Sequence, residues 1–286
     1  MRKRRLFFAT VIFLGLITSC TKELPLGEVN SQIRLTVNML GDNLQSPSVS
    51  VTLSSPINGT DSFPPVPNAK AYIISGTDTA KLAYDIFFKN YSLGTFKLQP
   101  STDYDLIVDA PGYPLATSML SMPQIIDLNG TVFKDSIGID NQGFPVGGVD
   151  IVLKDPGAIR NFYRLTFFTW STSLSEWEEA SLDFVDTDIA NAAQRNQNGN
   201  VLLKDDLFNG STQVIRLYAP FGFSGQNPKF KIIVDNLESN YYYYLQSIEN
   251  YQPSGGIFQE PAQILTNINN GVGIFAGSTQ TEFIIN

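Results

Sequence analysis

Apolar and polar residues alternate with a period of two through much of the first half of the chain. This period predicts strands over residues 33–39 and 49–53, each with one face directed to a core. A further strand is expected over residues 69–75. The segments 94–98 and 103–110 follow, joined through a proline-containing turn, and are expected to form a hairpin. The first half is therefore expected to be a β domain.

This hairpin resembles the small seven-stranded sandwiches of the transthyretin and carboxypeptidase-regulatory type. In those domains a "G-x-F-x-L" strand precedes "Y-x-L-x-V-x-A-x-G-Y", and the chain reads GTFKL at 94–98 and YDLIVDAPGY at 104–113. The resemblance implies an Ig-like or transthyretin-like β-sandwich. Alternation places Tyr104, Leu106 and Val108 on one face and Asp103, Asp105, Ile107 and Asp109 on the other, where a solvated face is a better interpretation of the carboxylates than a calcium site.

Aromatic and β-favouring residues mark the strands of the second half. Residues 162–170, FYRLTFFTW, give the clearest strand signal in the chain. Residues 171–210 are polar and are expected to be mostly loop, with a short helix over 186–195. Further strands are expected over residues 131–139, 149–153, 214–218, 230–234 and 281–285.

A second helix is expected over residues 241–249, with Ser239 and Asn240 as its N-terminal caps. Its predicted buried face consists of Tyr241, Tyr244, Leu245 and Ile248.

The predicted fold class is mainly β. An Ig-like or transthyretin-like β-sandwich is followed by a second β-rich domain with one or two short helices. The expected divisions are a signal peptide (1–19), a lipidated tether (20–30), the sandwich (31–127) and the second domain (128–286).

The first twenty residues have the features of a bacterial lipoprotein signal. Residues 2–5 are basic, and residues 6–16 form an apolar run that is too short to span a bilayer. Ile17-Thr18-Ser19-Cys20 resembles a lipobox, in which the cysteine is diacylated and the chain is cut before it. The alternative is an ordinary secretory signal with an incidental cysteine. Because Cys20 is the only cysteine and stands at the cleavage position, we expect it to carry the lipid anchor.

Processing makes the protein more acidic. The chain has 19 basic and 27 acidic residues, and removal of residues 1–19 takes away four basic groups, so the net charge falls from −8 to −12. An anionic membrane surface repels such a body, so the lipid must hold it there. Thr21-Lys22-Glu23 resembles the surface-export signal of Bacteroidota lipoproteins. We expect a lipid-anchored outer-membrane protein at the cell surface, with the periplasmic face of that membrane as the alternative.

The composition excludes several classes of function. Without histidine the chain cannot supply a Ser-His-Asp unit, a Cys-His unit or an HExxH zinc site. With one cysteine it has no intramolecular disulfide and no cysteine-rich metal site. Its acidic balance argues against binding to nucleic acid. We expect a protein that is not an enzyme and has no cofactor.

Two sets of residues are candidates for binding. Asp183, Asp186 and Asp188 offer oxygen atoms that suit calcium, but the glycine and the distal glutamate of an EF-hand loop are missing, so no metal is expected. Trp170 and Trp177 flank a polar loop and suit stacking on a sugar ring or contact with a partner protein. The alternative is that Trp170 belongs to the core and Trp177 is partly buried.

Two short motifs resemble the Bacteroidota O-glycosylation signal, which is an aspartate, a hydroxyl residue and an apolar residue. They are Asp78-Thr79-Ala80 and Asp135-Ser136-Ile137. Thr79 and Ser136 are therefore candidate modification sites, which intact-mass spectrometry of the native protein would test.

The segment 260–277, EPAQILTNINNGVGIFAG, resembles a signature of the Bacteroidota lipoproteins catalogued as domain of unknown function 4249, "EP-x-x-x-x-(S/T)-N-I-x-N-G-x-G-x-F". The resemblance implies an outer-membrane lipoprotein without assigned chemistry, often encoded beside TonB-dependent transporters, and it supplies no catalytic residues. Supporting matches are Cys20, the 94–113 hairpin, Met122-Pro123, Asp155-Pro156 with Asn161-Phe162-Tyr163, residues 206–210 and the tyrosine-rich segment.

A structural role explains this segment without a ligand. Gly271, Gly273 and Gly277 permit a positive φ or close backbone approach. The asparagines at 267, 269 and 270 can bind local backbone in turns. We favour a structural corner that closes the second domain over a ligand site.

Three functions remain open. The leading hypothesis is a non-enzymatic accessory subunit of an outer-membrane β-barrel complex, such as a TonB-dependent transporter. The second is a surface module that binds a glycan or a peptide, and the third is a carboxylate-based hydrolase.

Overall fold

The computed structural model describes residues 32–55, 63–139, 142–157, 159–181, 183–195, 200–218, 229–251 and 263–285. Cys20, the lipobox, the tether and the first three residues of the C-terminal motif lie outside these ranges. Across the ranges that are described, none of the helices has the length and apolarity needed to cross a membrane.

The fold is mainly β, as the sequence predicts. In the described residues the helices are α2 (Thr187–Ala192), α3 (Ser239–Asn250) and the 3-10 helix η1 (Asp205–Leu207). The strands are β1 (Leu35–Asp42), β2 (Ser48–Leu53), β3 (Lys70–Ser75), β4 (Asp78–Lys81), β5 (Ala83–Asp85), β6 (Asn90–Ser92), β7 (Asp103–Asp109), β8 (Ala116–Ser121), β9 (Val132–Ile139), β10 (Pro145–Lys154), β11 (Phe162–Ser171), β12 (Glu176–Glu179), β13 (Asp183–Phe184), β14 (Gln194–Arg195), β15 (Val201–Lys204), β16 (Thr212–Tyr218), β17 (Phe230–Leu237) and β18 (Val272–Ile285).

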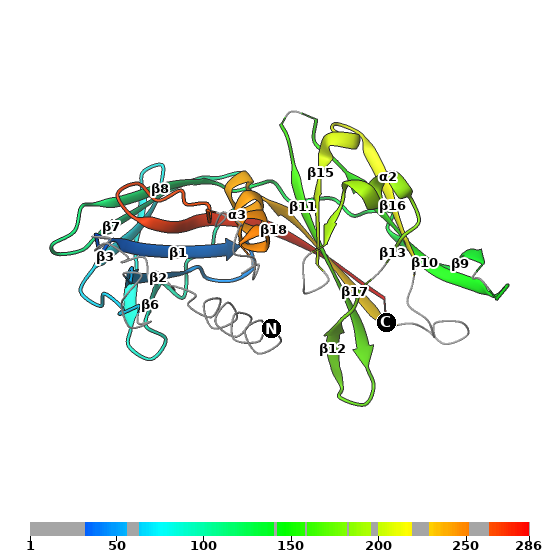
Figure 1. Ribbon diagram of the computed structural model, residues 1–286, viewed down its shortest axis with the longest axis horizontal. Coiled ribbons are helices and arrows are strands. Elements are labelled where there is room, and N and C mark those ends of the chain that lie inside the picture. The colour runs from blue at the N-terminus through cyan, green and yellow to red at the C-terminus, as the bar shows by residue number, and fades with distance from the viewer. Residues whose placement is uncertain are drawn as a thin grey trace, which may run out of the picture.

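One long sheet runs through both halves of the molecule (Figure 1). Among the described residues it has ten strands in the order β14–β15–β11–β17–β18–β1–β2–β6–β5, with β12 paired to β11. Two four-stranded sheets, β4–β3–β7–β8 and β13–β16–β10–β9, complete the β structure. Each small sheet shares a core with a different part of the long sheet, which makes two sandwiches side by side.

The first core is built from apolar side chains. Val37 and Val51 of the long sheet pack with Leu106 of β7, and all three are fully buried. The predicted alternation in β7 is confirmed, because Tyr104, Leu106 and Val108 are buried while the three aspartates are exposed. Those aspartates are therefore a solvated face.

The second core combines apolar side chains with buried polar groups. Tyr163, Leu165 and Phe167 of β11 belong to it, and the strand predicted over 162–170 is confirmed. The Tyr163 hydroxyl donates to the buried Asp155 carboxylate, which also accepts from the Gly210 backbone N–H at 2.7 Å. The carboxylate thereby joins two segments that are far apart in the sequence.

Strand β18 joins the two halves. It pairs in parallel with β1 on one side and antiparallel with β17 on the other. Phe275 enters the first core and Phe283 packs against the second, while Ile274 lies on the opposite face under helix α3. The boundary at 127/128 therefore stays a prediction, since the two halves share a sheet.

The C-terminal motif is structural, but it closes the first sandwich rather than the second. Asn267 holds Phe275 from both sides, since its Nδ2 donates to the Phe275 carbonyl at 2.7 Å and its Oδ1 accepts the Phe275 N–H at 2.9 Å. Asn269 and Thr117 of β8 exchange backbone hydrogen bonds of 2.8 and 3.2 Å. Gly273 has a φ of +116°, and a Cβ there would lie 2.1 Å from the Val37 carbonyl oxygen. The motif thus ties β8 and β1 to β18.

The predicted strand over 94–98 is wrong. Gly94 and Thr95 form a turn, closed by a 2.8 Å hydrogen bond from the Phe96 N–H to the Leu93 carbonyl. The period of two arises because Phe96 and Leu98 both pack into the first core from an irregular segment. Strand β7 instead pairs with β3 and β8.

The region 171–210 contains more structure than its polarity predicts. Strands β12, β13, β14 and β15 fall within it, and β15 places Val201 and Leu203 in the second core. The predicted short helix is confirmed as α2, capped by the Asp186 carboxylate.

Helix α3 is confirmed, but its predicted cap and face are partly wrong. Glu238 is the N-cap, and its carboxylate accepts the backbone N–H groups of Asn240 and Tyr241. Tyr241 and Tyr242 are the buried residues, whereas Ile248 is 41% exposed. Tyr242 is buried because its ring packs against Phe162 of β11, with centroids 4.7 Å apart.

Candidate functional sites

Strand β11 presents an aromatic surface where helix α3 no longer covers it. Phe162 lies under the helix, and the residues of the same parity further along, Phe168 and Trp170, are only half-buried. Strand β12 pairs with this end of β11 and sets Trp177 opposite Trp170, in the hairpin that protrudes from the body in Figure 1. The next strand of the long sheet, β17, places Lys231 opposite Phe168. We call Phe168, Trp170, Trp177, Lys229 and Lys231 the tryptophan face.

The side chains of the tryptophan face are held in contact with one another. The two indole rings meet edge to face, with centroids 5.3 Å apart and planes at 75°. The Lys231 Nζ lies 4.6 Å from the centroid of Phe168 and 5.5 Å from that of Trp177. Lys231 is also paired to Glu282 at 3.3 Å, and the Lys229 Nζ lies 5.9 Å from the Trp170 ring. Cation–π contacts and the ion pair restrict these long side chains before any partner arrives.

This arrangement suits recognition. Tryptophan side chains are common among the residues that dominate protein interfaces, because each brings a large rigid apolar area with one hydrogen-bond donor. The two lysines add positive charge to an otherwise acidic protein. The Trp170 core interpretation is wrong, because Trp170 is half-buried in the hairpin and lies on the sheet face opposite the second core.

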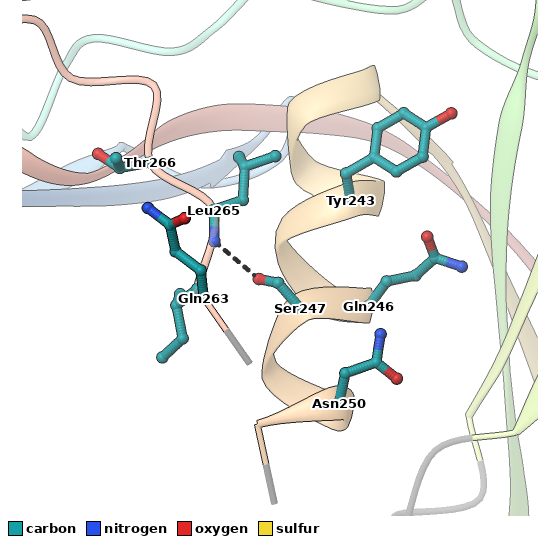
Figure 2. A pocket seen from close by; sticks show the side chains of 8 residues that line it. Tyr243, Gln246, Ser247, Asn250, Gln263, Leu265 and Thr266 are labelled. Atoms are coloured by element: carbon teal, nitrogen blue, oxygen red, sulfur yellow. Dashed lines mark hydrogen bonds between the residues drawn. The ribbon is translucent and has the colours of Figure 1, made fainter. Parts of the chain in front are cut away.

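A second candidate site is a shallow pocket between helix α3 and the segment 263–266 (Figure 2). Its volume is about 510 Å³. Tyr243, Gln246 and Asn250 come from the helix, and Gln263 comes from the facing segment. The Leu265 N–H donates to the Ser247 hydroxyl oxygen at 3.0 Å, which fixes the segment against the helix. The remaining lining residues are Ile264 and Thr266.

The chemistry of this pocket is that of hydrogen bonding. Its eight lining residues include three amides and no carboxylate. The Ser247 hydroxyl donates to the Tyr244 carbonyl at 2.7 Å, so it serves the helix rather than acting as a free nucleophile. The Gln246 amide already donates to Gln194 at 2.5 Å and to the Tyr242 hydroxyl at 3.2 Å. Amides beside a tyrosine ring are suited to a polar ligand such as a sugar.

The three aspartates considered for calcium serve separate roles. Asp186 caps helix α2, and Asp183 pairs with Arg195 at 3.3 Å. Asp188 lies exposed in the first turn of that helix. Within the described ranges, no three His, Cys, Asp or Glu side chains are grouped so that they could hold a metal ion.

The two candidate glycosylation residues are exposed on strands at the edges of the small sheets. Thr79 lies on β4 and Ser136 on β9. Their modification stays a prediction. Cys20, the predicted lipidation site, lies outside the described residues.

Sequence reasoning found the two tryptophans but missed the lysines and the pocket. The parity of Phe168 and Trp170 in one strand is a local signal of a shared face. Lys231 joins that face only through the pairing of β11 with β17, more than sixty residues later in the chain. The pocket residues Gln246 and Gln263 meet only because the motif segment returns to helix α3.

Comparison with known proteins gives little functional information. No curated protein matches the chain. Among solved structures, trypsin-activated alpha-2-macroglobulin from Escherichia coli is similar over 72% of this chain and 15% of its own length, at 11% sequence identity and a TM-score of 0.23. This chain thus spans a small part of that protein, and the likeness is too low to bear on fold or function.

The match to a protein family covers nearly the whole chain. Residues 22–284 match the family described as Domain of unknown function (DUF4249). This range includes both sandwiches, the tryptophan face and the C-terminal motif. The chain therefore belongs to the DUF4249 family.

Proposed function

We propose that the protein is a lipid-anchored outer-membrane lipoprotein that acts as a non-enzymatic accessory subunit of a β-barrel complex, with the tryptophan face as its contact surface. The observation that carries the proposal is this surface, in which aromatic side chains of the β11–β12 hairpin are fixed against lysines on and beside strand β17. A docking subunit needs a rigid patch with a high apolar content, and the tryptophan face has both properties.

The anchor is supported by the sequence. The basic residues 2–5, the apolar run 6–16 and the lipobox ending at Cys20 are the three parts of a lipoprotein signal. Two or three acyl chains on Cys20 would hold the acidic body at the membrane. Such a protein is placed to meet barrel proteins of the same membrane. The outer leaflet is the proposed location, with the periplasmic face as the alternative.

The charge of the tryptophan face favours a protein partner. Lys229 is exposed, while Lys231 is shared between Glu282 and two aromatic rings. The face also carries acidic groups, since Glu179 is paired opposite Phe168 and Glu282 is bonded to Lys231. Indole rings bordered by charges of both signs favour a protein surface with apolar groups and complementary charges. We propose that such a surface belongs to the barrel.

The test is purification of the full-length lipidated protein from detergent-solubilised outer membranes. We expect a β-barrel protein to be recovered in stoichiometric amount. Trp170→Ala combined with Trp177→Ala should lower that recovery at least about tenfold, because interface tryptophans commonly carry 2 kcal/mol or more of binding. Met119→Ala is the matched control, since Met119 is an exposed apolar residue on β8 of the other sandwich, 72% exposed.

The two possible failures have different meanings. If no barrel protein is recovered with the wild type, the accessory role is wrong. If recovery is unchanged in the double variant while its melting temperature equals that of the wild type, the barrel is bound through another surface.

The second candidate function is capture of a glycan, and the pocket beside helix α3 favours it. Its lining combines Tyr243 with the amides of Gln246, Asn250 and Gln263. Calorimetry with oligosaccharide libraries tests this function, with Tyr243→Ala and Gln263→Ala as variants. Binding that is lost in these variants but kept in the tryptophan double variant would assign the pocket. The absence of heat with every sugar would remove this candidate.

A further inference from the structure

The β5–β6 hairpin ends in three consecutive apolar side chains that point into solvent. Ile86, Phe87 and Phe88 are 74%, 89% and 78% exposed. Large apolar residues are common at protein surfaces when single, but three in a row at a hairpin tip form a protruding patch. The tryptophan face and the pocket do not include these residues.

The turn at the tip is held by hydrogen bonds between the Asp85 carboxylate and the tip backbone. The Asp85 Oδ1 accepts the backbone N–H of Phe87 at 2.8 Å and that of Phe88 at 3.1 Å. Lys89 takes a φ of +54°, which turns the chain back into β6. Two backbone donors of the tip are therefore satisfied within the turn. This matters for any segment that enters a medium without water, where an unpaired N–H is costly.

The register places the tip at the end of the sheet where the described chain begins. Strand β6 is antiparallel to β2 and pairs Tyr91 with Val49 and Ser92 with Ser48. The tip precedes β6, so the hairpin leaves the edge of β2 on the side of Leu53, where the segment 64–66 pairs with β2 at residues 51–53. Leu53 is paired with Leu35, the first residue of β1. Figure 1 shows this end of β1 and the end of the molecule that carries β9 at opposite extremes of the long axis.

Further apolar and basic residues lie at the same end. Ile33, 51% exposed, precedes Arg34, which is bonded to Ser54. Phe63, 61% exposed, precedes Pro64, whose carbonyl accepts the Leu53 N–H at 3.0 Å. We call Ile33, Phe63, Ile86, Phe87 and Phe88 the apolar end. Arg34 and Lys89 are exposed and immediately adjacent to it in the sequence.

We propose that the apolar end inserts into the interfacial region of the outer membrane and fixes the orientation of the body on the bilayer. The inference rests on the proposed anchoring through Cys20. Only eleven residues separate Cys20 from Gln32, the first described residue, and twelve steps of extended chain reach at most about 40 Å. The lipid therefore keeps this end of the sheet within about 40 Å of the membrane. Ile86, Phe87 and Phe88 then insert among the upper acyl chains, and Arg34 and Lys89 lie at the level of the lipid phosphate groups.

A bilayer explains this surface better than a protein partner does. The side chains of the apolar end are 51–89% exposed and come from three separate chain segments, whereas a protein interface has a packed centre. The end that carries them is also the end to which the lipidated tether leads. A protein partner at this site is the competing outcome of the test.

The test uses the full-length lipidated chain in phosphatidylcholine vesicles. Because the one cysteine of the chain carries the lipid, Phe87→Cys introduces a single free thiol for an environment-sensitive fluorophore. We expect a blue-shifted emission in vesicles and strong quenching when the acyl chains carry bromine. Phe144→Cys is the matched control, since Phe144 is 63% exposed in the β9–β10 hairpin at the other end of the molecule. Its label should stay water-like and should not be quenched.

Flotation of the same samples separates this inference from the proposed anchoring. If the protein does not float with the vesicles, the anchoring is wrong and the insertion falls with it. If it floats and the label at 87 behaves as the label at 144, insertion is overturned while anchoring stands. A label at 87 that is water-like in pure lipid but shielded in native outer membranes would show a protein partner at this end, and it would also overturn the proposal.

Discussion

The two sandwiches are stabilised in different ways although they share one sheet. The first has a core of aliphatic and aromatic side chains, and its ion pair Lys70–Asp109 lies on the surface with a separation of 3.9 Å. The second half buries charged groups. Asp155 lies beneath Tyr163, and Asp235, 1% exposed, is paired with Arg164 at 2.8 Å beneath helix α3.

This difference shows where specificity is encoded. Apolar groups pack without directional requirements, so the first core depends on shape and on the close approach of β18 to β1. Buried ions must meet defined partners, so in the second half they fix which segments adjoin. The tryptophan face and the pocket both lie on elements of the second half, where the backbone is positioned by these polar contacts.

The largest effect is expected from Arg164→Met. This change leaves the Asp235 carboxylate buried without its guanidinium, so we expect a loss of about 3–5 kcal/mol in the free energy of unfolding. The measurement is urea denaturation of the purified protein. Lys70→Met is the control from the first half, because both members of its ion pair are more than half exposed. It should change stability by less than about 1 kcal/mol.

A double variant tests the cause. Arg164→Met with Asp235→Leu removes both charges and should recover most of the lost stability, since no buried ion then remains unpaired. If the single variant costs no more than the Lys70 control, the contrast between the two halves is wrong.

The next effect concerns the first core. Gly273→Ala would place a Cβ 2.1 Å from the Val37 carbonyl oxygen at a φ of +116°. We expect a loss of about 3 kcal/mol from steric clash and backbone strain together. Gly76→Ala is the matched control, because Gly76 also has a positive φ but open space around its Cβ. It should cost about 1 kcal/mol.

Gly273→Ala also tests how far the halves depend on each other. Strand β18 pairs with both β1 and β17, so loosening it should lower the midpoint of a single unfolding transition shared by both halves. Tyrosine and tryptophan fluorescence monitors this transition. Both native tryptophans lie in the second half. If their signal keeps the wild-type midpoint while the first half unfolds earlier, the two sandwiches are independent in stability.

The role of β18 also shows what could be predicted from the sequence. Only 281–285 reads as a strand, because Gly271, Gly273 and Gly277 interrupt the pattern before it. Ile274, Phe275 and Ala276 are all buried, so a strand covered on both faces shows no alternation there. Its pairing with β1 joins residues more than two hundred positions apart, and no local signal records that contact.

Predictions from local sequence patterns were confirmed where the structure of one element depends on its own residues. The alternation of β7, the aromatic strand β11 and the short helix α2 follow from their own residues. The error at 94–98 has the opposite cause, since Phe96 and Leu98 are drawn inward by the core and not by strand pairing. The tryptophans of the candidate site were local as well, but Lys231 reaches them only through the sheet.

The smallest expected effect is the opposite pH dependence of the contributions that two buried carboxyl groups, Asp205 and Asp150, make to stability. Burial raises the pKa of Asp205 above its usual value, and the charge of Asp155 raises it further, although the Asn161 backbone N–H, bonded at 2.6 Å, opposes the shift. The hydrogen bond from Arg216 lowers the pKa of Asp150, although burial opposes this shift, and Lys134 lowers the pKa further.

These shifts make the two groups stabilise the folded state at different pH. Asp205 favours the folded state below about pH 4, the usual aspartate pKa, and that contribution is lost as the pH rises. Asp150 contributes above about pH 4 and its contribution is lost as the pH falls.

The two asparagine variants should therefore respond to pH in opposite directions. Asp205→Asn should cost about 0.5–1.5 kcal/mol below pH 4, because its amide brings two N–H donors to a buried position where Asp205 Oδ1 has no hydrogen-bond partner among the described residues. The difference from wild type should narrow as the pH rises towards neutral. The cost of Asp150→Asn should instead grow over the same range, because the wild type gains its ion pairs with Arg216 and Lys134. Urea denaturation at a series of pH values measures both. A difference between Asp205→Asn and wild type that does not change with pH would mean that Asp205 keeps an ordinary pKa, and its burial beside Asp155 would then carry no electrostatic cost.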